Sequence, residues 1–248
     1  MAQQADTERR KPLNRDRVLR AAVARADQSG IEALSMRGLA QELGVVPMAL
    51  YKHVANKEQL FDGMVELVVG EIDAPADGPD WRGAVRDRVL SARRALLRHP
   101  WALRAIESRG TPTPAVLDYL DSVIGTFRRG GLSVDLTHHA MHALGSRVWG
   151  FTQELFPASP AADPADPADP AGPADPAGRG DQGEQAAALR AMAARYPHIA
   201  EIATARAHDG ASVVGGGCDD QFEFEFALDL LLDGFARLHE CGWSSDGG

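Results

Sequence analysis

The sequence predicts an all-α protein with an N-terminal three-helix head, which contains a helix-turn-helix, and a larger helical body. Apolar residues recur three and four positions apart between glycine and proline breaks, and no segment alternates with the two-residue period of a strand. Charge is also divided along the chain. Residues 1–57 contain ten Lys and Arg and six Asp and Glu, a net charge of +4. The remaining residues contain sixteen Lys and Arg and twenty-nine Asp and Glu, a net charge of −13. The basic part is suited to approach phosphates.

Three helices are expected in the head. Asn14 can cap the first, and Gly30 follows its last apolar turn. Ser35 can cap the second, which we expect to end in a left-handed conformation at Gly44. Pro47 suits the first turn of the third helix. The residues expected on the inner face of this third helix are Leu50 and Val54.

The other face of the third helix is predicted to stay free, with Met48, Ala49, Tyr51, Lys52 and His53 on it. Such side chains fit a DNA major groove, where lysine reaches phosphates or guanine and small apolar groups touch thymine methyls. The alternative is an ordinary pair of surface helices, in which the tyrosine and histidine cover the core.

The residues from Asn14 to about Val69 resemble the DNA-binding domain of the tetracycline-repressor (TetR) family, most clearly in the run Leu-Tyr-x-His-Val-x-Asn-Lys at residues 50–57. The resemblance implies that the protein is a homodimer that binds double-stranded operator DNA. It implies base contacts from Arg37, Pro47, Met48, Ala49 and Lys52, and phosphate contacts from Ser35, Tyr51, His53 and Lys57. It also implies that a ligand in the body moves the helix that links body to head.

That linking helix is expected to follow Asn56, with Gln59 at the reciprocal position of a capping box. We therefore predict an N-terminal flexible arm over residues 1–13, a DNA-binding domain over 14–70 and an effector-binding and dimerisation domain over 80–243. Within the last domain, residues 157–183 carry an Ala-Asp-Pro repeat, which favours a disordered loop over a partner-binding proline motif.

Caps and breaks predict the body helices, with starts at Asp80, Thr113 and Ser133 and a short helix from Trp101 to Arg109. A last helix is expected to begin at Asp219 or Asp220 and to carry two apolar stripes. They consist of Phe224, Leu228, Leu231, Phe235 and Leu238, and of Phe222, Phe226 and Leu230. One stripe would pack on its own domain, and the other, with the Ser133 helix, would form a dimer interface.

A small hydrophobic or drug-like effector is expected in the body. The predicted contacts are Trp101, Arg104, Glu107, Phe127, Met141, His142, Trp149 and Gln153. His138 and His142 lie one helical turn apart, but without the intervening glutamate of a metalloprotease helix we expect no metal and no cofactor. Residues 104–112 also lack the His-x-Gly-Thr-Arg-Pro stretch of tetracycline repressors, so tetracycline with magnesium is not the expected ligand.

Two function classes remain, a ligand-controlled repressor of an efflux or biosynthetic gene and a helical enzyme or carrier with a DNA-binding-like head. The sequence offers no convergent nucleophile, base and orienting group, which favours a repressor without enzymatic activity. It contains neither a membrane-length apolar run nor the apolar core of a signal peptide, so we expect a cytoplasmic protein with no membrane contact.

Overall fold

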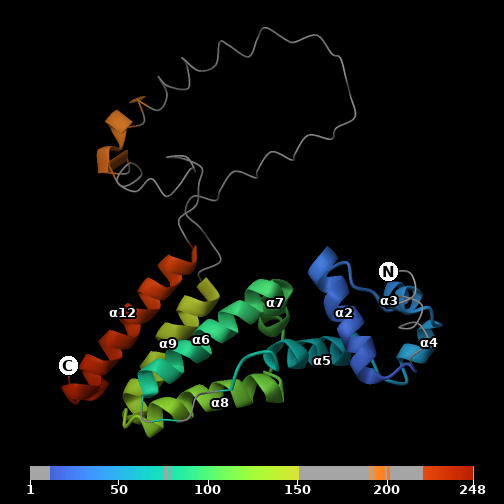
Figure 1. Ribbon diagram of the computed structural model, residues 1–248, viewed down its shortest axis with the longest axis horizontal. Helices are drawn as coiled ribbons and strands as arrows, with labels where there is room; N and C mark the ends of the chain where they lie inside the picture. Colours follow the sequence, from blue (N-terminus) through green and yellow to red (C-terminus); the bar gives the residue numbers. More distant parts are fainter. Residues whose placement is uncertain are drawn as a thin grey trace. The chain divides into compact units, whose positions relative to one another are not determined.

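The computed structural model describes residues 12–74, 78, 80–150, 190–191, 193–198, 200–201 and 220–247, and within them every regular element is a helix (Figure 1). The chain divides into two units, one of residues 1–150 with 227–248 and one of residues 151–226. Most of the predicted arm, the Ala-Asp-Pro loop and Gln153 lie outside the described residues. No helix in the described part has the length and apolarity of a membrane span.

The head helices form where the local caps predicted them. They are α2 (Arg15–Ser29), α3 (Met36–Leu43) and α4 (Pro47–Leu50). The Asn14 side chain accepts a hydrogen bond from the Arg17 amide at 2.8 Å, and the Ser35 hydroxyl accepts one from the Gly38 amide at 3.1 Å. Gly44 ends α3 with φ 68° and ψ 33°, the predicted left-handed cap, which other residues adopt only with strain.

The third helix is shorter than the sequence predicted. Its regular part ends at Leu50, and residues 51–53 form a turn in which the His53 and Val54 amides donate to the Leu50 carbonyl at 2.8 and 3.0 Å. Leu50 and Val54 are fully buried, so the predicted inner face is confirmed. Burial of both anchors fixes the turn, and with it the residues predicted to face DNA.

The linking helix is α5 (Lys57–Val69), and it packs on α2 as well as on α6, α7 and α8. Asn56 caps it by accepting from the Gln59 amide at 2.7 Å. The returning bond of the predicted capping box differs by one residue, because the Gln59 side chain accepts from the Ala55 amide rather than from that of Asn56. The chain still enters α5 through two reciprocal bonds.

The body helices are α6 (Trp81–Arg98), α7 (Trp101–Glu107), α8 (Pro114–Arg129), α9 (Val134–Gly150) and α12 (Asp220–Glu240), followed by the short 3-10 helix η2 (Ser245–Gly247). Asp80, Thr113 and Ser133 cap α6, α8 and α9 as predicted. One apolar cluster runs from Val18 in α2 through α5 to Val116 in α8. The proposed boundary between residues 70 and 80 therefore falls where head and body share a core.

Helix α12 carries two apolar stripes, and its buried stripe differs from the predicted one. Leu228, Leu232 and Phe235 are buried, whereas Leu231 is only partly buried. Phe235, which the predicted stripe also contained, packs its ring edge-on against the Phe127 ring of α8, with centroids 6.2 Å apart. The residues of the exposed stripe are Phe222, Phe226 and Leu230.

Candidate nucleic-acid interface and effector cavity

The residues predicted to contact DNA form an open face of the head. Exposed among them are Ser35, Arg37, Pro47, Met48, Tyr51, Lys52 and Lys57, whereas Ala49 and His53 are half-buried. The Met48 side chain is 70% exposed although it is large and apolar. Val46, 68% exposed, and Tyr51, 43% exposed, lie near it in the sequence, and a group of exposed apolar side chains suits a complementary partner where a single one would need no explanation.

Two ion pairs fix this face to its supporting helices. Arg25 of α2 pairs with Glu42 of α3 at 3.2 Å, and Arg15 of α2 pairs with Glu66 of α5 at 3.2 Å. Exposed pairs contribute little stability, but they set the angles between helices that apolar packing already holds together.

A cavity of about 1020 Å³ lies between α6, α8 and α9. Apolar side chains dominate its wall, including Val89 from α6, Val123 from α8 and Leu144 from α9. Met141 and His142, two of the predicted ligand contacts, also line it. The volume is that of a site for a drug-sized molecule.

The other predicted ligand contacts lie elsewhere or outside the described side chains. Trp101 and Phe127 are buried in the core and do not line this cavity. Arg104 pairs with Glu32 of the head at 3.1 Å, and Glu107 is exposed. The Trp149 side chain is not among those described.

Polar groups on the cavity wall are few. Burial raises the pKa of Tyr119 to about 12, with the Arg88 guanidinium acting in the opposite direction, so the phenol is neutral at physiological pH. The rings of His138 and His142 have centroids 4.6 Å apart and both line the cavity. Among the described residues no group of three or more His, Cys, Asp or Glu side chains is arranged so that it could hold a metal ion.

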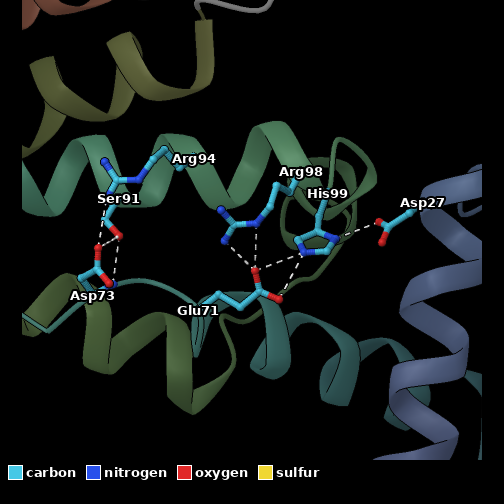
Figure 2. A network of polar contacts seen from close by, with 7 residues as sticks. All are labelled: Asp27, Glu71, Asp73, Ser91, Arg94, Arg98 and His99. Carbon is cyan, nitrogen blue, oxygen red and sulfur yellow. Dashed lines mark hydrogen bonds and ion pairs between the residues drawn. The ribbon is translucent and has the colours of Figure 1, made fainter.

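A polar cluster joins the head to the body, and sequence reasoning did not predict it. Figure 2 shows the imidazole of His99, at the end of α6, between Asp27 of α2 and Glu71, with ring nitrogens 2.8 Å from Asp27 Oδ1 and 3.3 Å from the Glu71 carboxylate. Trp101 Nε1 donates to the same Asp27 oxygen at 2.6 Å. Arg98 donates to Glu71 at 2.6 Å. We call these five residues the Asp27–His99 cluster.

The linker segment, residues 70–74 after α5, is bound to the body by further polar contacts. The Asp73 amide donates to Ser91 Oγ at 2.9 Å, and that hydroxyl and Arg94 donate to the Asp73 carboxylate at 2.8 and 2.9 Å (Figure 2). The Ser91 bond and the Arg94 guanidinium hold the pKa of Asp73 below its ordinary value, although desolvation opposes them. For Glu71 desolvation is the largest effect and raises the pKa, but the Arg98 bond and the charge of His99 outweigh it, so this pKa is also lowered.

The N-terminal and C-terminal parts of the chain each match a known protein family. Residues 18–64 match the family described as bacterial regulatory proteins, tetR family, and residues 74–238 match the tetracyclin repressor-like C-terminal domain. The chain is 40% identical over 123 residues to the HTH-type transcriptional repressor DrrR1 of Streptomyces coeruleorubidus, covering 49% of this chain and 46% of that protein. It is 42% identical over 90 residues to the class D tetracycline repressor of Escherichia coli, covering 35% and 41%.

Among solved structures, the Streptomyces coelicolor TetR family protein ActR in complex with actinorhodin is similar, with 25% identity and a TM-score of 0.63 over 92% of this chain and 98% of that chain. The chain spans about half the length of the curated relatives it matches.

Proposed function

Because the chain belongs to the TetR family of bacterial regulatory proteins, we propose that it is a ligand-responsive transcriptional repressor, which binds operator DNA and is released by a small-molecule inducer. The observation that carries this proposal is the open face of the head, where exposed cations and an exposed methionine lie around a turn that the buried residues Leu50 and Val54 anchor. A regulator in this family has no need of catalytic groups, and we propose no enzymatic activity.

The proposed DNA contacts are the nine residues predicted from the sequence. Arg37 and the face from Pro47 to Ala49, with Lys52, contact base edges in the major groove, which carries a distinct pattern for each base pair. Ser35, Tyr51, His53 and Lys57 contact phosphates, which position the head without reading sequence. Lys57 stands at the first turn of α5, where backbone amides and helix dipole also favour a phosphate.

We propose that the cavity between α6, α8 and α9 holds the inducer. Its volume of about 1020 Å³ and its mainly apolar wall suit a large, largely apolar molecule, with Tyr119, His138 and His142 as polar contacts. Two similar proteins are associated with small-molecule ligands, a tetracycline repressor by its name and ActR by its structure in complex with actinorhodin. We therefore expect the regulated gene to encode an efflux or biosynthetic protein.

The proposal also includes a homodimer that acts on DNA in the cytoplasm. We assign the exposed stripe of α12 to the dimer interface. In this stripe Phe226 is 54% exposed and Leu230 is 55% exposed. Two heads related by a two-fold axis would bind the two half-sites of a palindromic operator, whereas one head binds a single half-site.

The test is binding to the DNA upstream of the gene that encodes this chain, measured by fluorescence anisotropy at several salt concentrations. A repressor releases counterions, so the logarithm of its affinity falls linearly with the logarithm of salt concentration. Lys57→Ala should lower that slope by about one for every sequence, whereas Arg37→Ala should cost about 1–3 kcal/mol and relax the preference at one base pair. Unchanged binding in both folded variants would refute the assignment.

A further inference from the structure

We infer that Arg88 of α6 couples the effector cavity to the linker segment, and through it to the DNA-binding head. The guanidinium of Arg88 contacts the cavity wall on one side and the linker on the other, so a change at the wall alters the bonds that hold the linker. This inference rests on the proposed function, because it takes the cavity as the effector site and the head as the operator-binding part.

On the linker side, Arg88 binds two successive carbonyl groups. Its Nη1 donates to the carbonyl oxygens of Ile72, at 3.4 Å, and of Asp73. These carbonyls lie just after the C-terminal end of α5, where a cation is favoured by the helix dipole. Arg88 is thus a direct attachment between α6 and the chain that leaves the linking helix.

On the cavity side, Arg88 binds two residues of α8. Its guanidinium carbon lies 5.0 Å from the centre of the Tyr119 ring, a cation–π contact with a residue of the cavity wall. Its Nη2 donates to Ser122 Oγ at 3.1 Å, and that hydroxyl donates to the Tyr119 carbonyl at 2.7 Å. The next residue of α6, Val89, lines the cavity itself. A ligand that shifts Tyr119 therefore shifts two of the groups that orient Arg88.

The chemistry of the guanidinium makes these contacts interdependent. Its nitrogens are held in one rigid plane, so a tilt that follows Tyr119 and Ser122 at one edge moves Nη1 away from the carbonyls at the other. The Arg88 Nε is buried without a hydrogen-bond partner in the described part of the chain. The observed orientation therefore satisfies the outer nitrogens and leaves the inner one without a partner among the described residues, which carries a desolvation cost.

From the linker segment the connection continues to the head. Asp73 is two residues from Glu71, which binds His99, and His99 in turn binds Asp27 of α2 (Figure 2). A linker released at Ile72 and Asp73 changes the position of Glu71 relative to this cluster. The contacts thus supply a two-state element that cavity and head can both bias, which is the physical requirement for coupling.

The experiment compares Arg88→Met with Arg94→Met. Methionine keeps an unbranched apolar chain but removes the guanidinium. Arg94 also donates to Asp73, at 2.9 Å, but has no role in the cavity wall, so its variant controls for simple loosening of the linker. The cavity probe is 1-anilinonaphthalene-8-sulfonate, whose fluorescence reports its own binding. Val123→Trp, which places an indole ring at the cavity wall, verifies where the probe binds.

The measured quantity is the ratio of operator Kd with and without saturating probe. We expect a ratio of about fivefold or more for the wild type and for Arg94→Met, within the usual range of allosteric coupling. Arg88→Met should bind the probe and the operator separately, with a ratio within about twofold of one. Hydrogen exchange of the Asp73 amide should respond to the probe in the wild type and not in Arg88→Met.

Ser122→Ala provides a second variant with little risk to folding, because it removes only one hydroxyl, which accepts from Arg88 Nη2 and donates to the Tyr119 carbonyl. Its coupling ratio should fall at least about twofold below that of the wild type. The inference is overturned if folded Arg88→Met shows full coupling. It is also overturned if the wild type binds probe and operator without mutual effect, and in both cases the proposed function stays intact. A wild type that binds no upstream DNA, or whose cavity takes no probe, refutes the proposed function instead.

Discussion

Replacement of Asp27 tests whether the Asp27–His99 cluster holds the head to the body. Both hydrogen bonds to this residue, from Trp101 Nε1 and from the His99 ring, end on the same oxygen, Oδ1. Asp27→Ala removes that acceptor, whereas Asp27→Asn keeps an oxygen in place and removes only the charge. The two substitutions therefore separate the loss of an acceptor from the loss of an ion pair.

The expected magnitude follows from the burial of the two donors. Trp101 is 5% and His99 is 8% exposed, so neither N–H finds water once its acceptor is gone. Each of the two unsatisfied buried donors costs about 1–3 kcal/mol. Removal of the carboxylate also removes the cost of its partial desolvation in the folded state, so Asp27→Ala should lower the free energy of unfolding by about 2–4 kcal/mol. Asp27→Asn should cost about 1–2 kcal/mol, because neutral hydrogen bonds are weaker than charge-assisted ones.

Urea unfolding at pH 7, followed by circular dichroism and tryptophan fluorescence, measures these free energies. The matched control is Glu32→Ala, which breaks the Glu32–Arg104 pair between the head and α7, whose side chains are 69% and 77% exposed. We expect no measurable change for this control, because exposed ion pairs contribute little. An Asp27→Ala variant as stable as Glu32→Ala would refute the reasoning, and equal losses for alanine and asparagine would show that charge alone matters.

Three further predictions concern the interface, the packing of α5 and acid stability. Leu230→Glu should dissociate the dimer in sedimentation without unfolding the chain, whereas Phe235→Glu should unfold it, since Phe235 is buried within its own chain. Gly63→Ala should be about 1–3 kcal/mol less stable in thermal melts than Gly234→Ala, because a Cβ at Gly63 would lie 2.7 Å from a leucine methyl of α2 and one at Gly234 meets nothing within 4 Å. Since folding lowers the pKa of Glu71, its stabilisation is present above about pH 4.5 and is lost as the pH falls through the folded pKa. Glu71→Gln should therefore flatten the acid limb of the stability curve, and an unchanged limb would contradict this.

The elements of the head could be predicted from sequence because their determinants are local. The caps at Asn14 and Ser35 act within three residues, and the turn at Gly44 depends on a single φ angle. The length of α4 was not predictable in the same way. Its end at Leu50 is followed by a turn whose flanking residues, Leu50 and Val54, are both buried in the core, and burial is not visible in the local sequence.

The full wall of the cavity and the polar cluster could not be predicted, because both depend on which distant residues meet; of the predicted ligand contacts that the structure describes, only Met141 and His142 line the cavity. Trp101 is an aromatic residue in a candidate pocket helix by sequence, yet the structure buries it against the core, with its N–H on a carboxylate 74 positions away. Tyr119 is likewise an aromatic residue of a body helix, yet it lies on the cavity wall. Residue type alone does not tell a core residue from a cavity residue, since an aromatic side chain suits both equally.

The packing of α5 indicates where a change in the head must originate. Gly63 allows α2 and α5 to approach so closely that a single added carbon would collide with Leu19, and such an interface resists sliding. Helix α5 also packs on α8 and on α7, and α7 contributes Ala102 and Ala105 together with Trp101 to the shared core. The close contact of α2 with α5 should therefore make the head and α5 move as one body. The polar contacts of the linker segment, which depend on direction and can be exchanged for water, are then the part of the structure that sets its position.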